Sequence, residues 1–229
     1  MNTEMIKVFL VGGAVRDFLI GKKSKDLDFV VTANSFDEMK EFVKGLGCRI
    51  CQEAEKYGTI RAIHPVHGGV DFALPRKDEN CDGRHCTTVP TTSIVEDMAR
   101  RDFTMNAIAV ECDRNLNPEF GSMIDPFDGV GAINRKEIAF VGNAQQRIAE
   151  DSLRVLRAIR FSVTIGFEMT EETAEAVRMA SVGDEVSSDR VFTEMNKMAT
   201  VDNVAMVAAM VKSEKIGLFS RVKMVFSGK

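Results

Sequence analysis

The chain has 229 residues, of which 45% are hydrophobic, and its formal net charge is -4 at pH 7. This length fits one large domain or two small ones, and the mildly acidic balance argues against non-specific nucleic-acid binding over the whole surface. No apolar run reaches membrane-spanning length and no signal-peptide pattern opens the chain, so we expect no membrane association. The five cysteines lack framework spacing, which indicates a reducing, cytoplasmic location.

The most informative stretch, VFLVGGAVRDFLIGKKSKDLDFVV, begins at residue 8. Its short apolar run is rich in β-branched residues and stops at two glycines, which predicts a buried strand over residues 8–11. The glycines allow a tight turn and a close approach of an anion to backbone N–H groups, at the start of a helix predicted over 14–20. The glycines are Gly12 and Gly13, and the first helical turn holds Arg16 and Asp17.

Two carboxylates open the next predicted strand, over 26–31. Strand alternation puts Asp26 and Asp28 on one face, where they repel each other unless a cation lies beside them. Mg²⁺ is usually held by one or two carboxylates plus substrate phosphates. A hairpin predicted over 59–64 and 70–74 offers Asp71 as a third carboxylate. With the glycine turn, these acids indicate phosphoryl or nucleotidyl transfer with Mg²⁺ as cofactor. The alternative is a strand–turn–helix with exposed acids.

A second polar cluster lies in ARRDFTMNAIAVEC, after a long segment over 75–97 that is predicted to be a mobile loop. An arginine pair, an acid and an amide among apolar residues are costly to bury unless they bind a charged or hydrogen-bonding group. We therefore assign Arg101 to a triphosphate, and Asp102 and Asn106 to a ribose. The alternative is a solvated helix face with a capping network.

A long amphipathic helix is predicted from about residue 145 to 163, QQRIAEDSLRVLRAIRFSV. Glu150, Arg154 and Arg157 lie opposite its apolar stripe, with Asp151 beside them. We interpret Asp151 and Arg154 as readers of a base edge. The carboxylate accepts from the exocyclic amine of cytosine or adenine, and the guanidinium donates to the adjacent ring nitrogen, so uracil and guanine are rejected. The alternative is a surface helix with salt bridges. Further helices are predicted over 35–46, 171–180, 187–198 and 202–211.

Taken in order, GGAVRDFLIG with KDLDFVV, RRDFTMNAIAV, DPFDG and EDSLRVLRAIRFS resemble the motifs of one family. This is the class II tRNA nucleotidyltransferase (CCA-adding) and bacterial poly(A) polymerase family. The resemblance implies an α+β fold with a nucleotidyltransferase-type catalytic head, a small mixed sheet flanked by helices, over 1–140. It further implies an all-helical neck for base recognition over 141–180, and a truncated helical body that begins over 181–229.

The resemblance also implies roles for individual residues. In the family the D-x-D acids bind two Mg²⁺ ions, which fits Asp26 and Asp28, and the acid of the neighbouring strand corresponds to Asp71. The first motif contacts the triphosphate, the RRD motif contacts ribose and phosphate, and E-D-x-x-R reads the incoming CTP or ATP. The nucleotide-binding candidates in this chain are therefore Gly12, Gly13, Arg16, Asp17, Arg101, Asp102, Asn106, Asp151, Arg154 and Arg157.

The implied reaction is template-independent, in-line attack of a tRNA 3′-hydroxyl on the α-phosphate of CTP or ATP, with release of pyrophosphate. One metal ion activates the hydroxyl and the other steadies the pyrophosphate. Rival interpretations are an A-only or CC-only enzyme, a poly(A) polymerase, and a nucleotide- or tRNA-binding module without catalysis. The GRRF-type signature of the poly(A) polymerases is absent around residues 56–64, which favours tRNA 3′-end synthesis or repair.

Members of this family usually continue into body and tail domains that grip the tRNA. The present sequence ends at Lys229, shortly after the predicted start of the body. We therefore expect one of three arrangements: a naturally minimal enzyme, a homodimer or partner protein that compensates for the missing tail, or a loss of full CCA addition.

Overall fold

The computed structural model describes residues 6–24, 26–81, 87–180, 182 and 186–201. The chain divides into two compact units, described separately below. The first, which we call the head unit, comprises Met1–Glu79 and Thr88–Ile133, and the second, the helical unit, comprises Asn80–Thr87 and Asn134–Lys229. The predicted boundaries at residues 140 and 180 remain predictions, and the helix predicted over 202–211 lies outside the described residues.

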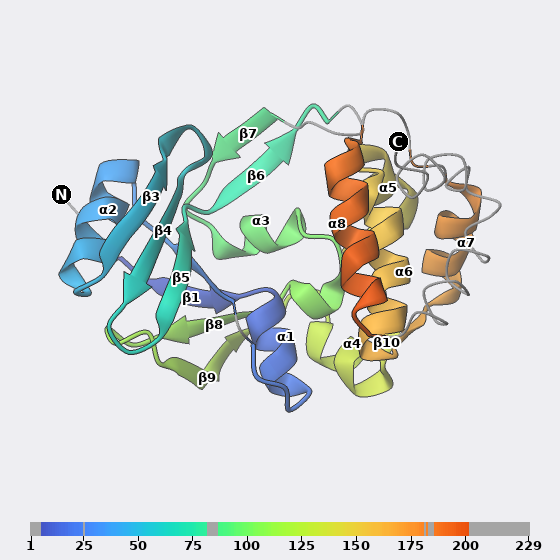
Figure 1. The fold of residues 1–229 in the computed structure, drawn as a ribbon, viewed down its shortest axis with the longest axis horizontal. Helices are drawn as coiled ribbons and strands as arrows, with labels where there is room; N and C mark the ends of the chain where they lie inside the picture. The colour runs from blue at the N-terminus through green and yellow to red at the C-terminus, as the bar shows by residue number, and fades with distance from the viewer. Residues whose placement is uncertain (1–5, 25, 82–86, 181, 183–185, 202–229) are drawn as a thin grey trace. The chain divides into compact units, whose positions relative to one another are not determined.

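A seven-stranded mixed sheet forms the centre of the head unit (Figure 1). Its strand order is β3-β4-β5-β2-β1-β8-β9; β2 and β5 run parallel, and the other neighbours are antiparallel. The predicted first strand and the predicted hairpin are confirmed. The strands are β1 Val8–Val11, β2 Leu27–Val31, β3 Arg49–Ala54, β4 Thr59–His64, β5 Gly68–Ala73, β8 Ala109–Cys112 and β9 Pro118–Ile124.

The core of the head unit follows from the apolar runs of its central strands. Every residue of β1 is buried, because sheet neighbours lie on both sides and helix α1 packs against it. Phe29 and Phe72 stack across β2 and β5 with ring centroids 5.5 Å apart. Ser35 caps α2 by accepting from the Glu38 N–H, as Ser does at helix starts. The helical segments are α1 Gly13–Leu19, α2 Phe36–Gly45, η1 Glu55–Tyr57, α3 Ile94–Ala99, η2 Thr104–Asn106 and α4 Gly129–Arg135, whose last residues enter the helical unit.

The segment over 75–97 contains regular structure, so its prediction as a loop was wrong. Strands β6 (Arg76–Glu79) and β7 (Thr87–Pro90) pair with each other, and α3 begins at Ile94. Polar contacts rather than apolar alternation hold β6, whose sequence is RKDE, so the usual strand pattern was missing. Cys81, just after β6, is disulfide-bonded.

The helical unit is built around α6, which packs against α5 and α8 (Figure 1). The helix predicted over 145–163 is in fact two helices, because Asp151 is extended (φ -153, ψ 103) and its side chain accepts from the Leu153 N–H. None of the described helices combines the length and apolar character needed to cross a bilayer. The elements are α5 Ala144–Glu150, α6 Leu153–Ile165, α7 Glu171–Met179, α8 Ser188–Ala199 and the parallel pair β10 Glu137–Ile138 and β11 Glu168–Met169.

Candidate functional site

Three carboxylates gather where β2 and β5 run side by side in the head unit. The parallel register pairs Asp28 directly with Asp71, which confirms their predicted proximity, and Asp26 immediately precedes β2. Asp26 and Asp28 are exposed, and among the described residues neither has an ion-pair partner. Asp71 Oδ1 lies 3.7 Å from Arg61 Nε. Two of these three carboxylates therefore lack an ion-pair partner among the described residues.

The surroundings of Asp28 raise the pKa of its carboxyl group. Desolvation raises the pKa of Asp28, and repulsion from Asp71 and Asp26 raises it further, against weaker lowering by Arg101 and Arg61. A divalent cation would relieve this repulsion, and carboxylate oxygens are ligands that suit Mg²⁺. The described residues contain no group of three or more His, Cys, Asp or Glu side chains placed to hold a metal ion. A bound Mg²⁺ would therefore depend on phosphate or water oxygens as well.

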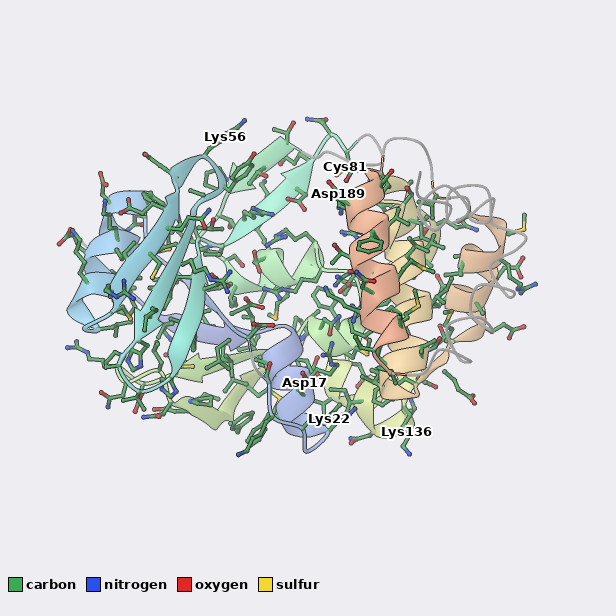
Figure 2. All side chains as sticks on the ribbon, in the orientation of Figure 1. Asp17, Lys22, Lys56, Cys81, Lys136 and Asp189 are labelled. Atoms are coloured by element: carbon green, nitrogen blue, oxygen red, sulfur yellow. The ribbon has the colours of Figure 1, made fainter. Side chains whose placement is uncertain are left out.

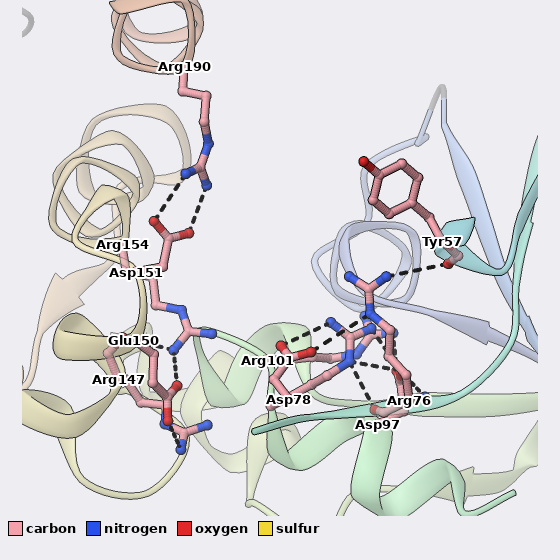
Figure 3. Close-up of polar contacts among 11 residues, drawn as sticks. Tyr57, Arg76, Asp78, Asp97, Arg101, Arg147, Glu150, Asp151, Arg154 and Arg190 are labelled. Carbon is pink, nitrogen blue, oxygen red and sulfur yellow. Dashed lines mark hydrogen bonds and ion pairs between the residues drawn. The ribbon is translucent and has the colours of Figure 1, made fainter. Parts of the chain in front are cut away.

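A buried carboxylate in α3 organises the arginines of the head unit (Figure 3). The fully buried side chain of Asp97 contacts Arg100 Nη2 at 2.7 Å and Arg101 Nη2 at 2.9 Å. It also accepts from the Arg76 backbone N–H at 3.3 Å. Burial alone would raise the pKa of Asp97, but the Arg101 and Arg100 guanidinium groups outweigh it and lower that pKa. Asp97 therefore holds both arginines in fixed positions.

The tip of Arg101 lies against the glycine turn before α1. Gly12 has φ +69, and a Cβ atom at this position would lie 3.0 Å from Arg101 Nη1. The Nε atom of Arg101 is buried and has no hydrogen-bond partner among the described residues. Arg76 and Arg100 add two guanidinium groups, whose contacts to Asp78 are long at 3.9 Å. Three arginine guanidinium groups thus lie around Asp78 and Asp97, and guanidinium groups are suited to bind a phosphate.

A hydrogen-bonded chain links α1 to the segment after α3. Arg16 is buried and donates to Asp17 Oδ1 at 2.6 Å and to Asn106 Oδ1 at 2.7 Å. Asn106 Nδ2 in turn donates to Asp102 Oδ1 at 3.1 Å, which also accepts from the Phe103 N–H. Asp17 lies on α1 (Figure 2). The structure therefore brings four of the predicted residues into one network, in which Arg16 is tied to protein groups.

The helical unit has its own charged cluster at the junction of α5 and α6 (Figure 3). Arg154 Nη1 donates to Glu150 Oε2 at 2.7 Å and to the Arg147 carbonyl at 2.8 Å. Arg147 Nη2 contacts the other Glu150 oxygen at 2.5 Å. Arg154 is buried, so it does not lie on an exposed helix surface, which was the alternative interpretation of this stretch. Asp151 lies at the break between the two helices, where its carboxylate meets Arg190 of α8 at 2.8 Å.

Arg157 sits one turn beyond Arg154, beside Glu194 and Phe161. Its Nη1 atom lies 3.8 Å from Glu194 Oε1, and its guanidinium is 5.7 Å from the Phe161 ring centroid. Glu194 is buried in α8 and also meets Arg160 Nε at 2.5 Å. These contacts fasten α8 to α6.

Asp97 and Arg190 are among the residues of these clusters that sequence reasoning missed. Asp97 precedes Arg100 and Arg101 by three and four positions, a helical spacing that could have predicted their ion pairs. Arg190 is 39 residues from Asp151, and no local pattern connects them. Only the packing of α8 on α6 reveals that contact.

The comparisons with known proteins agree on one family. The sequence pattern of the poly A polymerase head domain matches residues 8–139. The CCA-adding enzyme of Geobacillus kaustophilus is 37% identical over 194 residues, which cover 84% of this chain and 45% of that enzyme. The chain spans about half the length of the curated relatives that it matches.

Solved structures give the same result. The Bacillus stearothermophilus CCA-adding enzyme in complex with CTP is similar with a TM-score of 0.70 and 32% identity, over 86% of this chain and 45% of that one. A tRNA nucleotidyltransferase complexed with a primer tRNA and an incoming ATP analog gives a TM-score of 0.72 and 26% identity, over 96% of this chain and 60% of that one. The α+β fold predicted from the motifs is confirmed.

Proposed function

Because this chain belongs to the poly A polymerase head-domain family, we propose that it is a template-independent nucleotidyltransferase. It adds C and A from CTP and ATP to tRNA 3′ ends, as CCA synthesis or repair. The names of its relatives support the substrates: they are CCA-adding enzymes, and solved examples hold CTP, or a primer tRNA with an ATP analog. The GRRF-type signature of poly(A) polymerases is absent from the sequence, which favours tRNA over polyadenylation.

One observation carries the catalytic part of this proposal: Asp28 and Asp71 are direct neighbours in parallel strands, with Asp26 two residues before Asp28. A module that only binds nucleotides has no need for three acids that repel one another. We propose that Asp26 and Asp28, together with phosphate or water oxygens, hold two Mg²⁺ ions, which when bound supply positive charge to the attacking 3′-hydroxyl and the departing pyrophosphate. Asp71 lies beside them on the neighbouring strand. The reaction is in-line attack of that hydroxyl on the nucleotide α-phosphate.

The arginines and amides of the head unit bind the rest of the nucleotide in this proposal. Arg101, held by Asp97 against the Gly12 turn, contacts the triphosphate through its fork of donors. Gly13 leaves room for the same phosphates. Asp102 and Asn106 contact the ribose. Arg16 and Asp17 orient Asn106 through the hydrogen bond from Arg16 Nη1.

The helical unit supplies base selection in this proposal. Asp151 accepts a hydrogen bond from the exocyclic amine of cytosine or adenine, and Arg154 donates to the ring nitrogen beside it. Uracil and guanine offer a carbonyl and an N–H at the corresponding positions, so they leave both side chains unsatisfied, a penalty that can discriminate strongly. Arg157 supports this pair from the next turn of α6.

The test is an extension assay with the purified chain, Mg²⁺ and three tRNA substrates that end before CCA, after C and after CC. Each is incubated with single labelled nucleotides and read at nucleotide resolution. Addition of C, C and A in turn, stopping at CCA, is the expected result. A addition restricted to the CC-ending tRNA would identify an A-only enzyme. Addition that stops after CC would identify a CC-only enzyme, and a long A ladder would identify a poly(A) polymerase.

The remaining rival is a binding module without catalysis. Its signature would be CTP and ATP that bind measurably while no substrate is extended. That result would overturn the proposed activity and leave the family assignment intact.

A further inference from the structure

Asp151 of the helical unit has a partner that no motif assigns. Arg190 Nη2 donates to Asp151 Oδ2 at 2.8 Å, and Arg190 Nη1 donates to Asp151 Oδ1 at 3.3 Å (Figure 3). Both hydrogen bonds come from one planar guanidinium, so they fix the plane of the carboxylate as well as its position. A third donor, the Leu153 N–H, reaches Oδ1 at 3.2 Å.

The number of acceptor positions that remain on the Asp151 carboxylate determines what else it can bind. A carboxylate offers about four lone-pair positions, two on each oxygen. Arg190 and Leu153 use both positions on Oδ1 and one on Oδ2, and the described residues supply no other donor to this side chain. One acceptor position therefore remains, on Oδ2, and its direction is fixed. A single exocyclic amine fits that position.

The position of Arg190 is itself set by the packing of α8. Glu194 follows Arg190 by one helical turn, so both lie on the same face of α8. Glu194 is buried and receives Arg160 of α6 at 2.5 Å. This contact anchors α8 on α6 and directs Arg190 to the junction where α5 ends and α6 begins.

We propose that Arg190 is a specificity-determining positioning residue, which holds Asp151 so that only one acceptor, aimed in one direction, is offered to the incoming base. This inference rests on the proposed function, because it assumes that Asp151 reads the base. Without Arg190, only the Leu153 N–H, of the groups that the structure describes, restrains the carboxylate, so its hydrogen bond to the amine of CTP or ATP weakens. Binding of UTP and GTP, which lack an amine at that position, does not depend on the clamp.

The experiment measures equilibrium binding of CTP, ATP, UTP and GTP, so it does not require turnover. Arg190→Gln is expected to weaken CTP and ATP binding by about tenfold, the scale of one hydrogen bond to a charged group, and to leave UTP and GTP nearly unchanged. Arg190→Lys keeps the charge but not the fork, so it should restore part of the selectivity. Arg178→Gln on α7, which breaks an exposed pair with Glu175, is the matched control and should bind as the parent does.

A double-mutant cycle separates positioning from a purely structural role. If Arg190 acts through Asp151, then Arg190→Gln has no further effect on selectivity once Asp151→Ala is present. Equal weakening of all four nucleotides, or an undiminished effect in the Asp151→Ala background, would overturn the inference. If Arg190→Gln fails to fold by circular dichroism, Arg190→Lys decides: selectivity identical to the parent would count against the fork.

The two proposals fail in different ways. Selective binding of CTP and ATP that depends on Arg190, without any tRNA extension, would remove the enzymatic proposal and keep this inference. Correct CCA addition with unchanged selectivity in the Arg190 variants would keep the enzymatic proposal and remove this inference.

Discussion

The acids at β2 and β5 of the head unit differ from the acids of the helical unit in how they are paired with arginines. Asp26 and Asp28 have no ion-pair partner among the described residues, and Asp71 has only a 3.7 Å contact with Arg61. Glu150, Asp151 and Glu194 each meet at least one guanidinium at 2.8 Å or less. The two arrangements suit different roles, because unpaired acids can attract a cation, whereas paired acids hold the direction of a hydrogen bond.

The head unit contains both kinds within one sheet and its helices. Its arginines are fixed by Asp97, as directional donors need to be, while its acids at β2 and β5 are left with uncompensated charge. Substitutions in each group should therefore fail differently. Loss of the unpaired acids should remove chemistry with little effect on folding, and loss of the paired acid should first affect the fold.

The largest effect is expected for Asp26→Asn combined with Asp28→Asn. We expect incorporation to fall by about 10³-fold or more, since the negative charge that holds the cation is removed while shape is kept. CTP binding and the circular dichroism spectrum should change little. Glu41→Gln, a neutralised acid on the exposed face of α2, is the matched control and should retain full activity. Parallel losses of folding and binding would show that these acids are structural.

Asp97→Asn tests the paired acid. The variant keeps the side-chain volume but leaves Arg100 and Arg101 without their buried counter-charge, which should cost about 2–3 kcal/mol of unfolding free energy. Urea denaturation at pH 7 measures this loss. Asp37→Asn, an exposed acid in the first turn of α2, should change stability by no more than about 0.5 kcal/mol.

The stability difference between the parent and Asp97→Asn should change with pH in a predictable direction. The pKa of Asp97 is lowered in the fold, so its contribution is fully present above the unfolded value of about 3.9 and is lost as the pH falls through the folded value. The stability gap between the parent and Asp97→Asn should therefore be constant above about pH 5 and narrow in more acidic buffer. A gap that is independent of pH down to the acid unfolding range would contradict the ionised pair.

Some of these features could be predicted from the sequence, and others could not. Short apolar runs ended by glycine predicted β1 and the hairpin of β4 and β5, because burial and turn chemistry act locally. The predicted hairpin offered Asp71 as a third carboxylate, but its register could not be read from the sequence, and only the structure pairs it with Asp28. The break at Asp151 was missed because the apolar stripe continues across it. Only the hydrogen bond from the Leu153 N–H to the Asp151 side chain reveals that a new helix starts there. Arg190 was missed because its contact depends on how two distant helices pack.

Gly12→Ala tests whether Arg101 needs the space that the missing side chain of Gly12 leaves beside it. The variant must adopt φ +69 with a side chain, at a cost of about 2 kcal/mol, and its Cβ meets Arg101 Nη1 at 3.0 Å. Because Asp97 restrains Arg101, we expect kcat/KM to fall by about tenfold. Gly47→Ala is the matched control, since Gly47 also has a positive φ of +74 but nothing lies within 4 Å of its Cβ position. Equal losses of activity in both variants would mean that backbone strain, and not the approach to Arg101, matters.

The smallest expected effect is a gain in stability rather than a loss. Asp28 has a raised pKa, so its ionised form is disfavoured in the fold at neutral pH, and Asp28→Asn alone should stabilise the protein in the absence of divalent cations. The side chain is exposed and water screens the repulsion, so the gain should be a fraction of about 1 kcal/mol. Thermal melts in chelator measure it. Adding Mg²⁺ should then raise the melting temperature of the parent but not of the variant, because a cation that binds the folded acids stabilises only the protein that has them. If Mg²⁺ raises both melting temperatures equally, Asp28 does not hold the cation, and the contrast between unpaired and paired acids loses its functional meaning.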